Sequence, residues 1–138
     1  MIVLDTNVIS EMMKASPEAS VAKWLAQQKL SRLYTTWINI AEIQQGIFRL
    51  PNGKRKQNLT DVFSGFIQNA FEDRILSFDK AASFEYARIS EQREATGLHV
   101  DSVDLMIAAI ASANNFKIAT RNVSDFHHCD LELINPWP

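Results

Sequence analysis

Short apolar runs alternate along the chain with longer segments in which apolar residues recur at helical spacing. The runs that predict β-strands are Ile2–Leu4, Leu33–Trp37, Arg74–Phe78, Lys117–Thr120 and Leu131–Ile134. Strands that alternate with helices are typical of α/β folds, in which helices cover a mostly parallel sheet. The pattern therefore predicts an α/β/α sandwich around a central, mostly parallel sheet of about five strands.

The clearest predicted helix follows Pro51-Asn52-Gly53, a sequence typical of a turn between two helices. Its apolar positions are spaced three and four residues apart, at Leu59, Val62, Phe63, Phe66, Ile67 and Ala70. Other helices are predicted after Ser16-Pro17 as N-cap and first residue, through Ile40–Ile47, from Asp79 to Gly97, and from Ser102 as N-cap to Asn114. Phe63, Phe66, Ile67 and Phe71 offer more apolar helical surface than one small core needs. Surplus apolar surface of this kind marks an interface, which favours a homodimer.

Four acidic residues fall where ligands usually bind such sheets, at the carboxyl ends of the strands. Asp5 ends the first strand, Glu42 lies early in the next helix, Asp104 lies in the first turn of a later helix, and Asp125 follows the fourth strand. Carboxylates brought together repel one another, and a divalent cation removes that cost. Because Mg²⁺ and Mn²⁺ prefer oxygen ligands, the four acids predict a metal site able to act on a phosphodiester.

Each acid also has a purely structural interpretation. Asp5 could cap the helix that begins near Thr6, and Glu42 could complete a capping box with Asn39. A helix dipole favours Asp104 with or without a metal, and Asp125 could be a turn residue. The case for a metal site therefore rests on the four acids together.

Four ordered segments resemble the PIN-domain nucleases, and specifically the VapC/FitB-like toxins of bacterial toxin–antitoxin pairs. They are Ile2–Ser10, Asn39–Ile47, Asp104–Ala111 and Thr120–Phe126. Each segment is short, but together they span almost the whole chain at family-like spacing. The resemblance implies a single PIN domain over residues 1–138.

The same resemblance implies a function and a site. It implies the toxin of a type II toxin–antitoxin pair, an endoribonuclease that hydrolyses RNA with Mg²⁺ or Mn²⁺. The acids matching the family's ligands are Asp5, Glu42, Asp104 and, more variably, Asp125, and the residues matching its supporting positions are Thr6, Asn7, Thr120 and Asn122. The implied partners are RNA, a small antitoxin and a second copy of the chain, with operon DNA bound only through the antitoxin.

One neighbouring acid competes with this assignment. Asp101 precedes Asp104 by three residues, so either could face the site from a first helical turn. The family register favours Asp104. Asp101 is predicted to cap the helix, to face solvent, or to support the metal ligands without binding the metal itself.

Other interpretations remain open beside the nuclease. The chain could be a catalytically silent PIN-like module that binds RNA or protein, although four retained acids favour an enzyme. Asp5 also suits an aspartyl-phosphate phosphatase, but that chemistry needs a second Asp where Asn7 stands. A phospho-receiver domain needs an acidic pair after its first strand, and none follows Leu4.

Composition adds limited constraints. The net charge of −2 neither supports nor excludes RNA, and Lys54-Arg55-Lys56 is either a solvated helix start or a guide for phosphates. A single cysteine, Cys129, excludes an internal disulfide, and its neighbours His127, His128 and Asp130 predict a surface loop rather than a metal cluster. With no apolar run near ~20 residues, we expect a cytoplasmic protein without a membrane segment.

Overall fold

The computed structural model describes residues 1–98 and 101–138. Its sheet has five strands in the order β3-β2-β1-β4-β5, and every pair is parallel. The strands are β1 (Ile2–Leu4), β2 (Leu33–Thr36), β3 (Ile75–Leu76), β4 (Lys117–Ala119) and β5 (Leu133–Ile134). The central strand β1 pairs with both β2 and β4, so the sheet fixes the end of β1 beside the ends of its neighbours.

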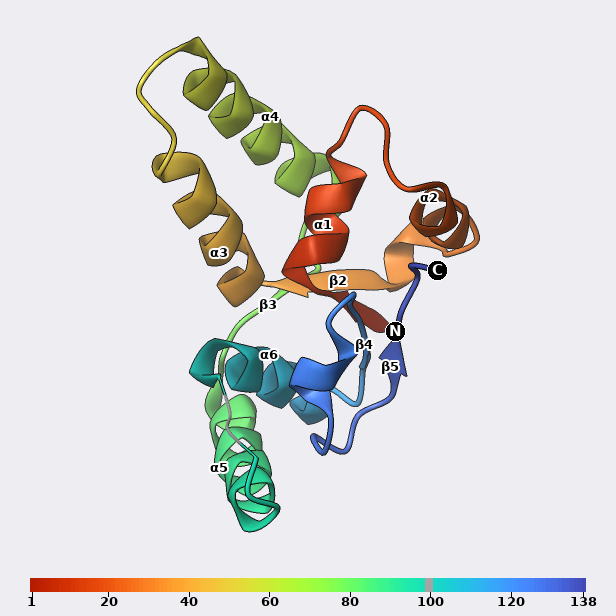
Figure 1. Cartoon of the computed structure of the whole chain (residues 1–138), viewed down its shortest axis with the longest axis vertical. Coiled ribbons are helices and arrows are strands. Elements are labelled where there is room, and N and C mark those ends of the chain that lie inside the picture. Colours follow the sequence, from red (N-terminus) through yellow and green to blue (C-terminus); the bar gives the residue numbers. More distant parts are fainter. Residues whose placement is uncertain (99–100) are drawn as a thin grey trace.

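Helices cover both faces of this sheet (Figure 1). One face carries α1 (Thr6–Met12), α2 (Ala19–Ala26), α3 (Trp37–Phe48) and α4 (Lys54–Ala70), and the other carries α5 (Lys80–Ala95) and α6 (Ser102–Ala113). Short 3₁₀ helices, η1 (Leu30–Arg32) and η2 (Val123–Phe126), complete the described elements.

Two apolar cores lie on the two sides of the sheet. Ile2 and Leu4 face the core under α1, α3 and α4, whereas Val3 faces the core under α5 and α6. This follows from the strand geometry, because successive side chains point to opposite faces. A strand buried on both faces reads as a continuous apolar run, which explains why β1 could be predicted from its sequence.

The helix and strand predictions are confirmed, but several ends differ. Trp37 begins α3 instead of ending β2, because the Thr36 hydroxyl caps the helix by accepting a hydrogen bond from the Asn39 backbone N–H (3.1 Å). Two residues were predicted as caps of α6: Ser102 is wrong, and Asp101 is confirmed as the N-cap, accepting from the Val103 backbone N–H (2.8 Å).

The start of α2 is a further correction. Ser16 and Pro17 precede the helix, and Glu18 is its N-cap without a side-chain hydrogen bond. The reason lies in α1, where the buried Glu11 carboxylate accepts from the Glu18 backbone N–H (3.3 Å) and so fixes where the chain turns into α2. The predicted Asp79 cap of α5 is confirmed, with its carboxylate accepting from the Ala82 N–H (3.0 Å).

The apolar surplus predicted on α4 is not exposed. Phe63 and Phe71 are buried in the core, and Phe66 and Ile67 pack against it. The large apolar side chains that do face solvent are different ones, and they include Val62 of α4 itself as well as Trp37, Phe48 and Phe84. Within residues 1–98 and 101–138, no helix is both long and apolar enough to cross a membrane.

Candidate active site

The predicted acids gather at the carboxyl edge of the sheet. Asp5 directly follows β1, and its backbone N–H donates to the Ala119 carbonyl of β4 (3.0 Å). Glu42 lies in the second turn of α3, which follows β2, and Asp104 lies in the first turn of α6. Asp125 lies in η2 after β4, and its side chain is exposed.

Asp5 is the buried centre of this group, with 5% of its surface exposed. One carboxylate oxygen, Oδ1, accepts from the Thr6 backbone N–H (2.9 Å) and from Asn39 Nδ2 (3.0 Å). The other, Oδ2, accepts from the Thr120 hydroxyl (2.8 Å). Burial raises the pKa of Asp5 above its ordinary value, these donors oppose the rise, and the charge of Asp125 adds to it.

The structural interpretation of Asp5 is also correct, because Asp5 is the N-cap of α1. A cap whose second oxygen is held from a distant strand has a further task, since capping needs only one acceptor. Capping therefore does not explain why Thr120 reaches across from the end of β4.

Glu42 is tied to Asp5 through a hydroxyl. The Thr6 hydroxyl donates to Glu42 Oε1 (2.8 Å), so the Glu42 side chain turns toward α1 and not toward its own helix start. The predicted capping box of Asn39 and Glu42 is therefore wrong, and Thr36 is the cap. Burial raises the pKa of Glu42, and the charges of Asp5 and Asp101 raise it further.

The pKa of Asp104 is raised by burial and by the charge of every other acid in the group. Burial first, then the charges of Asp5, Asp101, Asp125 and Glu42, raise its pKa to about 7. The charges of the other three predicted acids therefore all act on Asp104, and Asp101 acts with them while its own carboxylate caps α6.

The predicted supporting residues contact the site in different ways. Thr6 and Thr120 contact the acids directly. Asn7 Nδ2 donates to the Thr120 hydroxyl (3.4 Å), while Asn122 approaches the same hydroxyl with its backbone N–H (3.1 Å) and not its side chain.

Sequence analysis missed Asn39 as a site residue. Its side chain is fully buried and donates to Asp5 and to the Thr6 hydroxyl (3.1 Å). The available signal was a polar residue in the apolar segment Trp37–Ile40, which the sequence assigned to capping.

The donor set fits a divalent cation by its chemistry. The acids offer hard oxygen ligands. Burial first, and then the charges of neighbouring acids, raise the pKa of Asp5, Glu42 and Asp104, and a cation would relieve both costs. Within the described residues, no three acidic, histidine or cysteine side chains are placed to hold one ion together. Mg²⁺ sites in proteins typically use one or two carboxylates and keep several waters, so two of these acids suffice to begin one.

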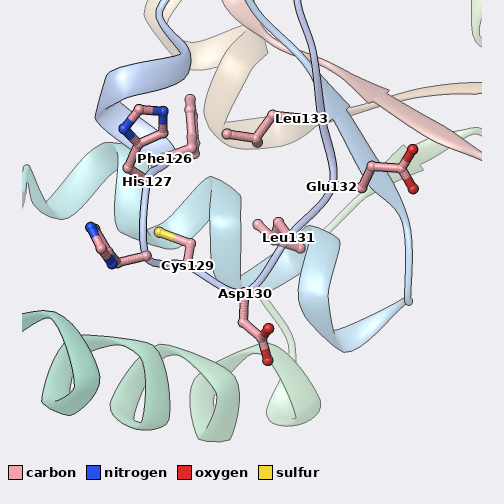
Figure 2. A pocket seen from close by; sticks show the side chains of 8 residues that line it. Phe126, His127, Cys129, Asp130, Leu131, Glu132 and Leu133 are labelled. Carbon is pink, nitrogen blue, oxygen red and sulfur yellow. The ribbon is translucent and has the colours of Figure 1, made fainter.

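The run His127–Asp130 forms a separate, shallow pocket with the residues up to Leu133 (Figure 2). His127, Cys129 and Asp130 point in different directions there. The prediction of a surface loop is right for the two histidines and Asp130 and wrong for Cys129, which is buried. Arg93 of α5 reaches this thiol (3.4 Å) and the Asp125 carbonyl (2.7 Å), and so joins α5 to the segment that carries Asp125.

The pKa of Asp104 predicts how the metal-free protein responds to pH. Its folded pKa of about 7 lies above the ordinary 3.8, so ionising Asp104 costs folding stability. This loss of folding stability is absent below about pH 4, where Asp104 is protonated in both states, and it grows until the pH passes about 7. In EDTA, the melting temperature should therefore fall from pH 5 to pH 8, and Asp104→Asn should reduce the fall.

Thermal unfolding followed by circular dichroism at constant ionic strength measures this. The control is Asp61→Asn, which changes an exposed acid of α4 whose charge is not among those acting on Asp104. Equal slopes for Asp104→Asn and the unchanged chain would contradict the prediction.

Comparison with known proteins adds a family context to this geometry. The family model described as "PIN domain" matches residues 2–130. The chain is 42% identical to the plasmid stability protein StbB of Pseudomonas syringae pv. tomato, over 99% of both chains. It is 41% identical to the VapC ribonuclease Y4jK of Sinorhizobium fredii, over 99% of this chain and 98% of the relative. It is 36% identical to the toxin FitB of Neisseria gonorrhoeae, over 99% of both.

Solved structures are similar over the same extent. FitAB bound to the IR36 DNA fragment includes a chain with a TM-score of 0.93 and 36% identity, covering 100% of this chain and 96% of that one. VapBC2 of Rickettsia felis, bound to a DNA fragment from its promoter, includes a chain with a TM-score of 0.82 and 26% identity, covering 100% of both.

Proposed function

Because the chain belongs to the PIN-domain family, in the group that includes VapC and FitB proteins, we propose that it is the toxin of a type II toxin–antitoxin pair. Its activity is hydrolysis of RNA phosphodiester bonds, as an endoribonuclease that depends on Mg²⁺ or Mn²⁺. The names of two relatives, a ribonuclease and a toxin, support this function.

One observation carries the proposal within this chain. The buried Asp5 carboxylate meets three hydrogen-bond donors, while the charges of the other acids converge on Asp104. Its three hydrogen-bond partners in the described part of the chain all donate, so its oxygens are kept as acceptors. Burying a charged carboxylate in this way costs folding free energy, because its three donors are uncharged and do not neutralise the acids. A merely structural site would gain nothing for that cost.

The residues proposed to hold the cation are Asp5, Glu42, Asp104 and Asp125. When bound, the cation lowers the pKa of water and neutralises charge on the phosphodiester. Thr6 at the start of α1 and Thr120 at the end of β4 orient the carboxylates of Glu42 and Asp5, and Asn7 and Asn122 hold the Thr120 hydroxyl in place. The exposed position of Asp125 keeps the site open to a polymer as large as RNA.

The direct test uses purified protein, free of antitoxin, with total RNA. Cleavage with Mg²⁺ or Mn²⁺ that stops in excess EDTA supports the proposal, and sequencing of the new RNA ends would define the substrate. RNA binding without cleavage at any metal concentration would instead favour a catalytically silent PIN-like module.

An antitoxin partner is part of the proposal. The related complexes FitAB and VapBC2 were solved with DNA, so we expect operon DNA to be bound through the antitoxin.

We also propose a homodimer. Its apolar surface is expected at exposed residues such as Phe84 of α5, in place of the buried α4 phenylalanines. Light scattering that gives about 15.6 kDa at micromolar concentration would exclude the dimer.

A small groove of about 30 Å³ between α3 and α4, lined by three apolar and three polar residues, is the proposed contact for an apolar antitoxin segment. Its lining includes Ile47, Phe48 and Phe63, and Phe48 is 63% exposed. Lys56 donates to the Phe48 carbonyl (3.1 Å) and lies over the Phe48 ring. This lysine therefore stabilises the turn after α3, whether or not it also guides phosphates.

Phe48→Asp should weaken binding of the cognate antitoxin about 30-fold or more, the size typical of an interface hot spot. Calorimetric titration with the antitoxin encoded beside this gene measures the effect. Val62→Asp is the matched control, since it changes another exposed apolar residue that does not line the groove. Equal losses in both variants would mean that the groove is not the binding site.

A further inference from the structure

Asn39 lies in the first turn of α3, and its side chain is fully buried. Three hydrogen bonds engage this side chain, and among the described residues all three partners are side chains. The Thr36 hydroxyl donates to Asn39 Oδ1 (2.6 Å), while Nδ2 donates to Asp5 Oδ1 and to the Thr6 hydroxyl. The side chain therefore links α3 to the end of β1 and to the start of α1.

The direction of each bond in this network is fixed. The Thr36 oxygen accepts from the Asn39 backbone N–H, so its hydroxyl hydrogen is free to point at Asn39 Oδ1. That places the carbonyl side of the amide toward Thr36 and its NH₂ group toward Asp5 and Thr6. Thr6, which accepts from Asn39, then donates its own hydrogen to Glu42 Oε1.

A structural role alone does not account for this arrangement. Thr36 caps α3, so the Asn39 side chain is not needed for the helix end. A buried amide costs free energy unless it is bonded, and an apolar residue would fill the same space without that cost. The amide is therefore explained by the acids that its bonds reach, which are Asp5 directly and Glu42 through the Thr6 hydroxyl.

We propose that Asn39 is a positioning residue for the metal site. It holds the Asp5 carboxylate directly, and the Glu42 carboxylate through Thr6, as a pair of oxygen acceptors ready for one divalent cation. This inference rests on the proposed function, because it assigns Asn39 a part in the same site.

The test measures metal binding without RNA. Free Mn²⁺ is followed by electron paramagnetic resonance during titration of the whole chain and of Asn39→Ala. The Kd for Mn²⁺ should rise about tenfold or more in Asn39→Ala, because outer partners of metal ligands typically contribute 10–100-fold to affinity. Circular dichroism in EDTA establishes that each protein is folded.

Thr35→Val is the matched control. Thr35 is as buried as Asn39, and its hydroxyl donates to the Leu4 carbonyl (3.1 Å) next to Asp5 without a side-chain bond to any acid. Its Kd for Mn²⁺ should stay within about twofold of the unchanged chain, since it keeps every outer partner of the acids. An unchanged Kd in folded Asn39→Ala, or an equal rise in Thr35→Val, overturns the inference.

A second measurement covers the case in which Asn39→Ala does not fold. In the unchanged chain, Mg²⁺ should shift the side-chain amide resonances of Asn39 with the same midpoint as the Thr6 backbone amide, which also contacts Asp5. The Asn114 side-chain amide, which donates to the Ile110 carbonyl (2.8 Å), should not shift. A static Asn39 amide beside a shifting Thr6 amide overturns the inference.

The outcomes separate this inference from the proposed function. If the unchanged chain binds no Mn²⁺, the metal site itself is wrong, and the role of Asn39 is rejected with it. If the unchanged chain binds Mn²⁺ and Asn39→Ala binds it equally well, the proposed function stands and only the inference is rejected.

Discussion

Asp5→Asn is expected to abolish RNA cleavage and growth inhibition while the chain remains folded. The substitution keeps the shape of the side chain, and its remaining oxygen can still accept from the Thr6 N–H and cap α1. It removes the buried charge to which three donors point. Because outer partners of metal ligands already contribute 10–100-fold, loss of Asp5 as a proposed ligand should lower the cleavage rate by at least about 100-fold.

The measurement is single-turnover cleavage of one RNA at saturating Mn²⁺, together with thermal unfolding in EDTA. The unfolding temperature should not fall at pH 8, because burial raises the pKa of Asp5 and its charge therefore costs stability in the metal-free protein. Glu132→Gln, which changes an exposed acid paired with Lys117, serves as the control. Undiminished cleavage by Asp5→Asn, or full activity in excess EDTA, would refute the carboxylate-centred mechanism.

The second large effect separates two neighbouring acids. Asp104→Asn should lower the cleavage rate about 100-fold, whereas Asp101→Asn should lower it by no more than a few fold. The reason is their different surroundings. Asp104 is half-buried where the charges of the other acids converge, while Asp101 is exposed and caps α6, a task that asparagine performs equally well.

The same single-turnover assay decides between three outcomes. A large loss confined to Asp104→Asn supports the assignment. Equal losses would mean that both acids serve the metal, as the effect of Asp101 on the pKa values of Asp104 and Glu42 allows. A loss confined to Asp101→Asn would show that the register of α6 relative to the metal had been misassigned.

The sequence predicted the elements better than their ends. The short apolar runs of the strands and the three-and-four spacing in the helices are local patterns, so both survive in the structure. The ends depend on single hydrogen bonds, such as that of Thr36 at α3 or of Asp101 at α6, and two adjacent polar residues compete for each. The buried state of Phe63 and Phe71 depends on how α4 packs, which spacing alone does not show.

Local pattern also explains how much of the candidate site could be predicted. That the acids lie at one edge could be predicted because each stands at the end of a strand or near the start of a helix, and parallel strands end at one edge. Asn39 and Cys129 could not be placed, because the partners that explain their burial are distant in sequence. Asn39 contacts Asp5 across 34 positions, and Cys129 contacts Arg93 across 36.

The bond between Thr120 and Asp5 joins positions 115 residues apart, and β4 pairs with β1 over the same span. Pairing between such distant segments forms late, since a large loop must close first. On the ribosome, Asp5 emerges long before Thr120, so the carboxylate lacks this partner until nearly the whole chain has been made. On the proposed function, we therefore expect a growing polypeptide of this kind to leave the RNA around it intact until β4 has been made.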